Sequence, residues 1–126
     1  MNLSRIYAIA FGAVYTLVGI AGMFVSTTLA TGTLILFPVN VVHNIVHLAI
    51  GLAGIAAFMS GRTVEYARGA AVLFLVLVIA GFLPQPLLGI VPLGGFDIAL
   101  HAASGILAFV AGWLYVNQGA RRSSVA

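Results

Sequence analysis

The sequence predicts an all-α fold, a bundle of four transmembrane helices, and three observations lead to it. Of the 126 residues, 63% are hydrophobic and 6% are charged, and the mean hydropathy of +1.22 lies far above that of soluble domains. Four apolar stretches approach the roughly 20 residues that a helix needs to cross a bilayer. The basic residues lie at the ends of these stretches. We therefore expect one membrane domain over residues 1–126, without a soluble part.

The first span is expected at about residues 6–25, where the chain carries no charge. It is followed by a polar loop rich in threonine. A signal peptide is the alternative interpretation, because Arg5 precedes the apolar run and residues 28–30 loosely resemble a cleavage site. The run is longer than the roughly 7–15 residues of a signal-peptide core, which favours a retained span.

The remaining spans are expected at about residues 41–59, 67–83 and 96–115. A charged turn separates the second from the third, and Pro84-Gln85-Pro86 ends the third, because proline lacks a backbone donor and fixes φ. The apolar link at residues 87–93 is interrupted by glycine and proline, so it cannot span. We expect it to lie at the membrane interface or to pack on the bundle.

The arginines define the expected topology. They occupy the amino terminus, the turn between the second and third spans, and the carboxyl terminus: Arg5, Arg62, Arg68, Arg121 and Arg122. Because cytoplasmic segments of membrane proteins are enriched in basic residues, both termini are expected in the cytoplasm. The chain is then a multi-pass protein of the cell inner (plasma) membrane.

An internal repeat supports the four-span count. A shift of 54 positions places residues 43–51 on residues 97–105, and matches His47 with His101 and Gly51 with Gly105. Each half is then a helical hairpin that enters from the cytoplasm, so the two hairpins are parallel repeats. The second and fourth helices should therefore run in the same direction.

Two pairs of polar residues begin these two helices. His43 and His47 are four residues apart, as are Asp97 and His101, so each pair lies on one helical face. If the repeat holds, the four side chains converge at the outer side of the membrane. Three imidazoles and a carboxylate match the ligand preferences of Zn²⁺, Cu²⁺ or Fe²⁺. The sequence thus predicts a metal site, with Asn40 orienting a ring nitrogen as an outer partner.

Two alternatives to a metal site stay open from the sequence. The polar residues can be purely structural, with Asn40 and Asp97 capping or charging helix N-termini. His47 and His101, at equal depth, can instead ligate one haem iron from opposite sides. A face of small residues below them would then admit the porphyrin, namely Gly51, Gly54, Gly105, Ala108 and Gly112.

The expected partners are the lipid bilayer and other membrane subunits, with no nucleic acid. An accessory role in a larger complex would use Gly12, Gly19 and Gly22 as a docking face, although packing within the bundle is the favoured use of these glycines. The sequence contains no nucleophile motif, phosphate-binding loop or general-base pair. It therefore predicts no catalytic residue and favours a non-enzymatic role.

The motif Asn40-x-x-His43-Asn44-x-x-His47-x-x-x-Gly51, paired with Asp97-x-x-x-His101-x-x-x-Gly105, resembles a family of small four-helix bacterial membrane proteins. This family is catalogued as a domain of unknown function. The resemblance covers nearly the whole chain and implies four spans. It also implies that the Asn, His and Asp positions of this motif recur in the family, and it implies no activity.

The distribution of arginines generates the first prediction, which concerns topology. Cytoplasmic reporters inserted at Gly61 or fused after Ala126 should be active, and reporters inserted near Thr31 or Gly94 should report the outside. Activity of the Thr31 and Gly94 fusions in the cytoplasm would contradict this topology. A mature protein that begins near Thr31 would instead support the signal-peptide interpretation and leave three spans.

Overall fold

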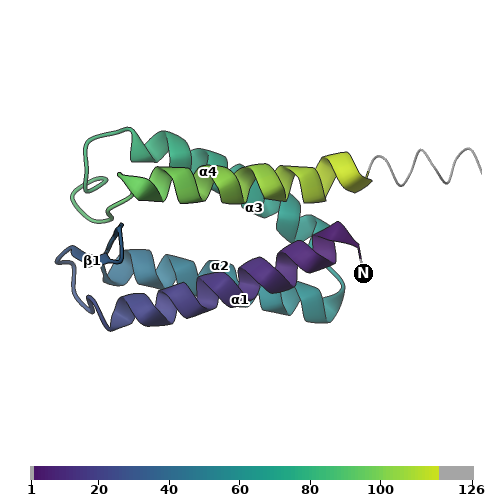
Figure 1. Ribbon diagram of the computed structural model, residues 1–126, viewed down its shortest axis with the longest axis horizontal. Helices are drawn as coiled ribbons and strands as arrows, with labels where there is room; N and C mark the ends of the chain where they lie inside the picture. Colours follow the sequence, from purple (N-terminus) through teal and green to yellow (C-terminus); the bar gives the residue numbers. More distant parts are fainter. Residues whose placement is uncertain (1, 117–126) are drawn as a thin grey trace, which may run out of the picture.

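A computed structural model describes residues 2–116 and shows a bundle of four long helices (Figure 1). The helices are α1 (Leu3–Met23), α2 (Val41–Ser60), α3 (Thr63–Gly81) and α4 (Phe96–Phe109), and α4 continues as a π-helical segment, η1 (Val110–Leu114). Counting α4 and η1 together, each helix is long and apolar enough to cross a membrane. The predicted all-α fold with four such helices is confirmed.

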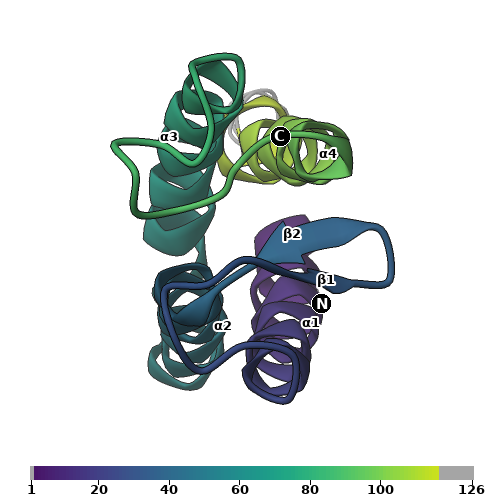
Figure 2. The same cartoon turned by 90° about the vertical axis from the view of Figure 1, so that its left-hand side faces the viewer.

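Helices that follow one another along the chain lie side by side, α1 with α2 and α3 with α4 (Figure 1). Viewed along the bundle, the helices occupy the corners of a square, with α2 facing α3 and α1 facing α4 (Figure 2). Because each helix reverses the direction of the one before it, α2 and α4 begin at the same end. We call this end, formed by residues 24–40 and 82–95, the loop end.

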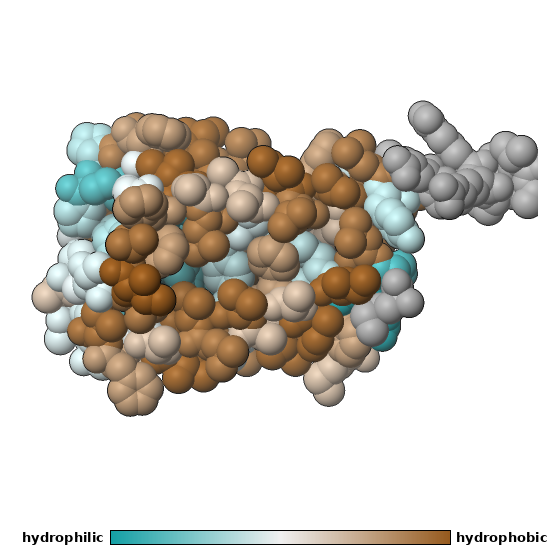
Figure 3. Space-filling model, in the orientation of Figure 1, coloured by the Kyte–Doolittle hydropathy of each residue, from teal (hydrophilic) through white to brown (hydrophobic). Residues whose placement is uncertain are grey.

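The opposite end, which we call the Arg end, carries Arg5, Arg62 and Arg68. The Arg5 guanidinium lies 4.5 Å from the centre of the Phe58 ring, and Arg68 Nε donates a hydrogen bond of 2.9 Å to the carbonyl of Gly112. Arg121 and Arg122 lie outside the described residues. The surface between the two ends is mostly apolar on the face shown in Figure 3, except for hydrophilic residues in the hollow between α1 and α4, and an apolar surface suits contact with lipid. The internal repeat and the cytoplasmic termini stay predictions.

Two helices begin earlier than the hydropathy predicts. In α1 the side chain of Asn2 caps the first turn by accepting a hydrogen bond of 3.0 Å from the backbone N–H of Arg5. The first turns of α3 contain Glu65 and Arg68, although the charged turn was expected to precede the third span. Long charged side chains can reach water from a helix end, so the helix extends beyond its apolar part.

The loop end contains a short hairpin that the sequence analysis did not predict. Strand β1 (Gly32–Leu34) pairs antiparallel with β2 (Phe37–Val39). The turn between them places Ile35 at a φ of 57°. Three-residue strands give too short a pattern to distinguish from a loop.

The link between α3 and α4 packs on the bundle, which is one of the two expected positions. Leu93 is 4% exposed, and Leu87 pairs with Val91 in an isolated bridge. The side chain of Gln85 organises the link by accepting a hydrogen bond of 2.7 Å from the N–H of Leu93. This segment therefore covers part of the loop end.

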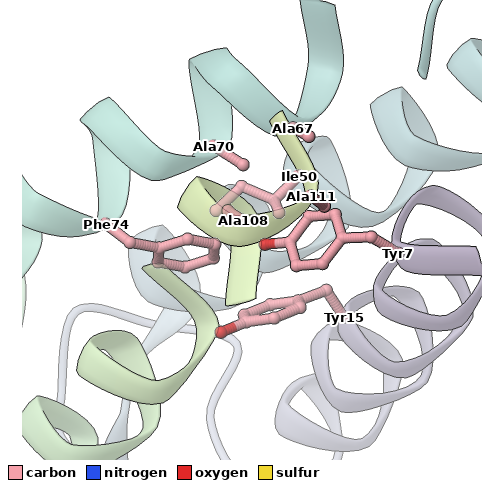
Figure 4. Packing of buried hydrophobic residues seen from close by; sticks show 8 residues of the cluster. All are labelled: Tyr7, Tyr15, Ile50, Ala67, Ala70, Phe74, Ala108 and Ala111. Carbon is pink, nitrogen blue, oxygen red and sulfur yellow. The ribbon is translucent and has the colours of Figure 1, made fainter. Parts of the chain in front are cut away.

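A small core of aromatic residues and alanines joins the helices (Figure 4). Tyr7 and Tyr15 of α1 meet Phe74 of α3, and the space around them is filled by Ile50, Ala67, Ala70, Ala108 and Ala111. Both tyrosine hydroxyls bond to Ser104 of α4: that of Tyr7 donates to its carbonyl at 3.0 Å, and that of Tyr15 lies 2.7 Å from its Oγ. The buried polar groups of these tyrosines are thereby satisfied.

Glycines bring α1 and α2 into backbone contact. A Cβ on Gly12 would lie 2.9 Å from the backbone nitrogen of Ile55, and a Cβ on Gly19 would lie 2.9 Å from that of Leu48. Gly22 faces the side chain of Asn44 in the same way. The favoured use of these glycines, packing within the bundle, is confirmed, and they do not form a free docking face.

The close contact of α1 and α2 generates the second prediction. A Cβ on Gly51 would collide with the backbone of Thr16 and lie 2.8 Å from the carbonyl of Gly12, so Gly51→Ala should destabilise the fold by about 1–3 kcal/mol. Gly69→Ala is the matched control, because nothing lies within 4 Å of its Cβ position on α3. Thermal unfolding in detergent measures both. Equal stability of the two variants would contradict this account of the packing.

Candidate metal centre

The four predicted ligands meet in the interior of the bundle near the loop end. His43 and His47 lie on one face of the first turns of α2, and Asp97 and His101 lie on one face of the first turns of α4. All four side chains are buried, none more than 2% exposed. The convergence follows from the direction and position of the two helices, since both begin at the same end and lie diagonally opposite each other in the bundle (Figure 2).

The donor atoms are close enough together to share one ion. One ligand atom from each of the four residues lies within 4.8 Å of the other three. Nε2 of His43 is 2.9 Å from Nε2 of His47 and 3.4 Å from Oδ2 of Asp97, and that Oδ2 is 3.6 Å from Nε2 of His101. In a tetrahedral site with metal–ligand distances of about 2.0–2.1 Å, donor atoms are separated by about 3.3 Å. These three distances between donor atoms thus differ by at most about 0.4 Å from the separation expected around a tetrahedral ion.

The orientation of the His43 ring is set by a backbone carbonyl. Nδ1 of His43 lies 2.6 Å from the carbonyl oxygen of Pro92, in the link between α3 and α4. A carbonyl can only accept, so Nδ1 carries the proton, and in the neutral ring Nε2 presents its lone pair to the cluster. A metal-binding histidine is held in this way by an outer partner. Sequence reasoning did not find Pro92, because the contact involves a backbone atom in an irregular segment.

The Asp97 carboxylate has no hydrogen-bond donor among the described residues. Both of its oxygens are buried without a partner, and its side chain does not cap α4 although it stands in the first turn. Its Oδ2 instead faces Nε2 of His43, which is also an acceptor in the tautomer just described. Two acceptors at 3.4 Å repel each other unless a cation or an additional proton lies between them.

Asn40 organises the backbone around the cluster. Its Oδ1 accepts a hydrogen bond of 3.0 Å from the N–H of His43, which caps α2, and its Nδ2 donates to the carbonyls of Leu29 and Ile90. Asn40 is thus the helix cap that the structural alternative expected, and it makes no hydrogen bond to an imidazole ring. Asn40 therefore positions His43 indirectly, because it fixes the first turn of α2 and connects the two loops at this end.

Aromatic rings fix the two deeper imidazoles. Tyr15 meets the ring of His47 edge-on, with ring centres 5.2 Å apart, and Phe74 packs on His101 at 5.6 Å. The sequence analysis did not assign Tyr15 to the site. Its spacing of four residues from Phe11 and of eight from Tyr7 was the available signal, because it predicts an aromatic face on α1.

Asn44 lies next to His43 in sequence but does not face the cluster. Its Nδ2 donates a hydrogen bond of 2.9 Å to the carbonyl of Ser26 and lies 4.0 Å from Sδ of Met23, so it connects α2 to the end of α1. The side chain is fully buried. Asn44 is therefore a buried polar neighbour of the cluster that contributes no ligand atom.

Comparison with known proteins gives a family and no activity. No curated protein and no solved structure matches the chain significantly. The family described as "Domain of unknown function (DUF4383)" matches residues 5–114, a range that contains the four helices almost completely and all four residues of the cluster. The resemblance seen in the sequence is confirmed at the level of the family. The chain belongs to the DUF4383 family of domains of unknown function.

Proposed function

We propose that this protein binds one divalent transition-metal ion within the membrane through His43, His47, Asp97 and His101. The observation that carries the proposal is the buried Asp97 carboxylate, which faces imidazole nitrogens and has no hydrogen-bond donor among the described residues. Zn²⁺, Cu²⁺ and Fe²⁺ are the candidates, because each accepts nitrogen and oxygen ligands. The absence of cysteine from the sequence excludes thiolate ligands.

The charge of the cluster supports this proposal. An unpaired carboxylate in an apolar interior is costly, and on the insertion scale this cost reaches about 2.5–3.5 kcal/mol at the bilayer centre and is smaller toward the loop end, where Asp97 lies. The charge is compensated if the carboxyl group or an imidazole takes up a proton, or if the four donor atoms share a cation. A divalent ion satisfies all four donor atoms at once, whereas one proton leaves acceptors facing each other.

Close packing below the cluster favours a bare ion over haem. The haem alternative needs space for a porphyrin along the small residues of α2 and α4. Gly51 is in contact with Thr16 of α1, and a Cβ on Gly105 would lie 3.1 Å from Cβ of Phe74. These glycines accommodate neighbouring helices, so the face that would admit a porphyrin is occupied.

The proposed setting of the site is the outer side of the inner membrane. The loop end holds the cluster, and the Arg end is expected to face the cytoplasm. Because the glycines of α1 are buried against α2, they do not offer the docking face that an accessory subunit would use. A non-enzymatic, metal-holding role is the simplest function for this donor set.

The third prediction tests the metal directly. Elemental analysis of gently purified protein should find about one Zn, Cu or Fe per chain, and the absorption spectrum should lack a Soret band. His47→Ala and His101→Ala should each lower the affinity for that metal at least tenfold, or by about 1.4 kcal/mol, because each removes a ligand from the same ion. Titration of the metal-depleted protein with the identified ion measures the affinity.

Asn44→Ala is the matched control for these variants. It removes a buried polar side chain from the same helix but no ligand atom, so it should lower stability and leave metal affinity unchanged. Negligible metal in the parent protein, with the histidine variants changing only stability, would favour a protonated structural cluster. A Soret band would favour haem. If His47→Ala loses the metal and His101→Ala does not, α2 and α4 do not share one site.

The fourth prediction concerns Asn40, which touches no ligand ring. Asn40→Ala should lower stability by about 1 kcal/mol through the lost cap and should weaken metal binding less than either histidine variant. Asn40→Ser keeps an acceptor for the cap but cannot reach both loop carbonyls, so it separates the two contributions. Equal loss of metal affinity in Asn40→Ala and His101→Ala would contradict the assignment of Asn40 to an outer role.

A further inference from the structure

Two apolar cavities lie on opposite sides of the cluster. One, of about 130 Å³, lies between α2 and α3 beneath the link that precedes α4. The other, of about 140 Å³, lies between α1 and α4 beneath the β-hairpin. Figure 3 shows the face formed by α1 and α4, on which hydrophilic residues are visible at the bottom of a hollow between the two helices. The first cavity is lined by residues of α2 and α3, and these two helices form the opposite side of the bundle in Figure 2.

The cavity between α2 and α3 has the more extensive contact with the cluster. Three of the four cluster residues line it, namely His43, His47 and His101. All its other lining residues are valine or leucine, among them Val46 and Leu77. The opposite cavity meets only His47 of the cluster. A molecule in the first cavity would therefore lie against three imidazoles that we propose as metal ligands.

The size and lining of this cavity restrict what it can hold. Ligand pockets for drug-sized molecules measure about 300–1,000 Å³, which is larger than the space available here. An apolar cavity of about 150 Å³ excludes water and takes up benzene or xenon. A charged or strongly polar ligand would lose its hydration among aliphatic side chains without compensating hydrogen bonds.

We propose that the cavity between α2 and α3 is a binding site for a small, uncharged, apolar molecule, no larger than benzene, that reaches the cluster from the bilayer. This inference rests on the proposed metal site, because the ion gives such a molecule a specific partner. Four protein ligands do not fill the coordination sphere of Fe²⁺, so a diatomic molecule in the cavity can add a further bond to the ion.

Nitric oxide is a suitable probe, since it is small and uncharged and binds ferrous iron. The full-length protein in detergent is loaded with Fe²⁺ without oxygen and titrated with nitric oxide, and electron paramagnetic resonance follows the iron–nitrosyl signal. Leu77→Phe fills the cavity between α2 and α3, and Val18→Phe fills the opposite cavity as a matched control. We expect the parent and Val18→Phe to give the same signal, and Leu77→Phe to hold Fe²⁺ equally but bind nitric oxide at least tenfold more weakly.

Equal nitric oxide affinity in Leu77→Phe and the parent, at equal iron content, would overturn the proposal. If the parent protein does not bind Fe²⁺, the proposal that this ion occupies the site fails. In that case, xenon binding to the metal-free protein, followed by NMR, tests the cavity without a metal. Because xenon can enter both cavities, the readout is the set of xenon-induced shifts of the methyl groups that line the cavity between α2 and α3, such as those of Val46. Loss of these shifts in Leu77→Phe and their retention in Val18→Phe would support the cavity as a site for apolar molecules. Their absence from the parent protein, or their retention in Leu77→Phe, would overturn it.

Discussion

The structure depends on one constraint, the burial of the Asp97 carboxylate inside an apolar bundle. A carboxylate at this position needs a positive partner or a proton, and no lysine or arginine among the described residues contacts it. The surrounding imidazoles come from α2 and from the next turn of α4, so these two helices must begin at the same end and direct their first turns toward the centre of the bundle from diagonally opposite corners. This requirement gives both loops at that end a structural role, because they set where each helix starts.

The glycines of α1 and α2 and the aromatic residues of α1 complement each other. Contact between the backbones at Gly12 and Gly51 brings α1 close to α2, and this places Tyr15 beside His47. The hydroxyl of Tyr15 bonds to Ser104, one turn after His101, so the same residue connects α1 to both ligand-bearing helices. Close packing therefore does more than stabilise the bundle, since it restricts the rotation of the imidazole rings.

The sequence was sufficient for the helices and for the four cluster residues, because hydropathy and four-residue spacing depend on local pattern. It was insufficient where the contact depends on backbone atoms of loops. The carbonyl of Pro92 holds His43, and nothing in the type of that residue indicates this role. The β-hairpin was missed for a related reason, since three-residue strands lack a recognisable period. Asn40 was expected to orient an imidazole nitrogen, but its hydrogen bonds cap α2 and connect the two loops, and none reaches an imidazole ring.

The two ways of approaching the cluster differ in chemistry. From the loop end, Asn40 joins the loop that follows α1 to the link that precedes α4, and Pro92 fixes that link to His43. A hydrated ion that enters from this side must break polar contacts. From the side, the cavities are lined by aliphatic and aromatic residues and meet the imidazole rings directly. An ion would be poorly solvated by such a lining, so the ion and an apolar molecule would reach the same donor atoms by different routes. The apolar molecule could then exchange while the ion stays bound.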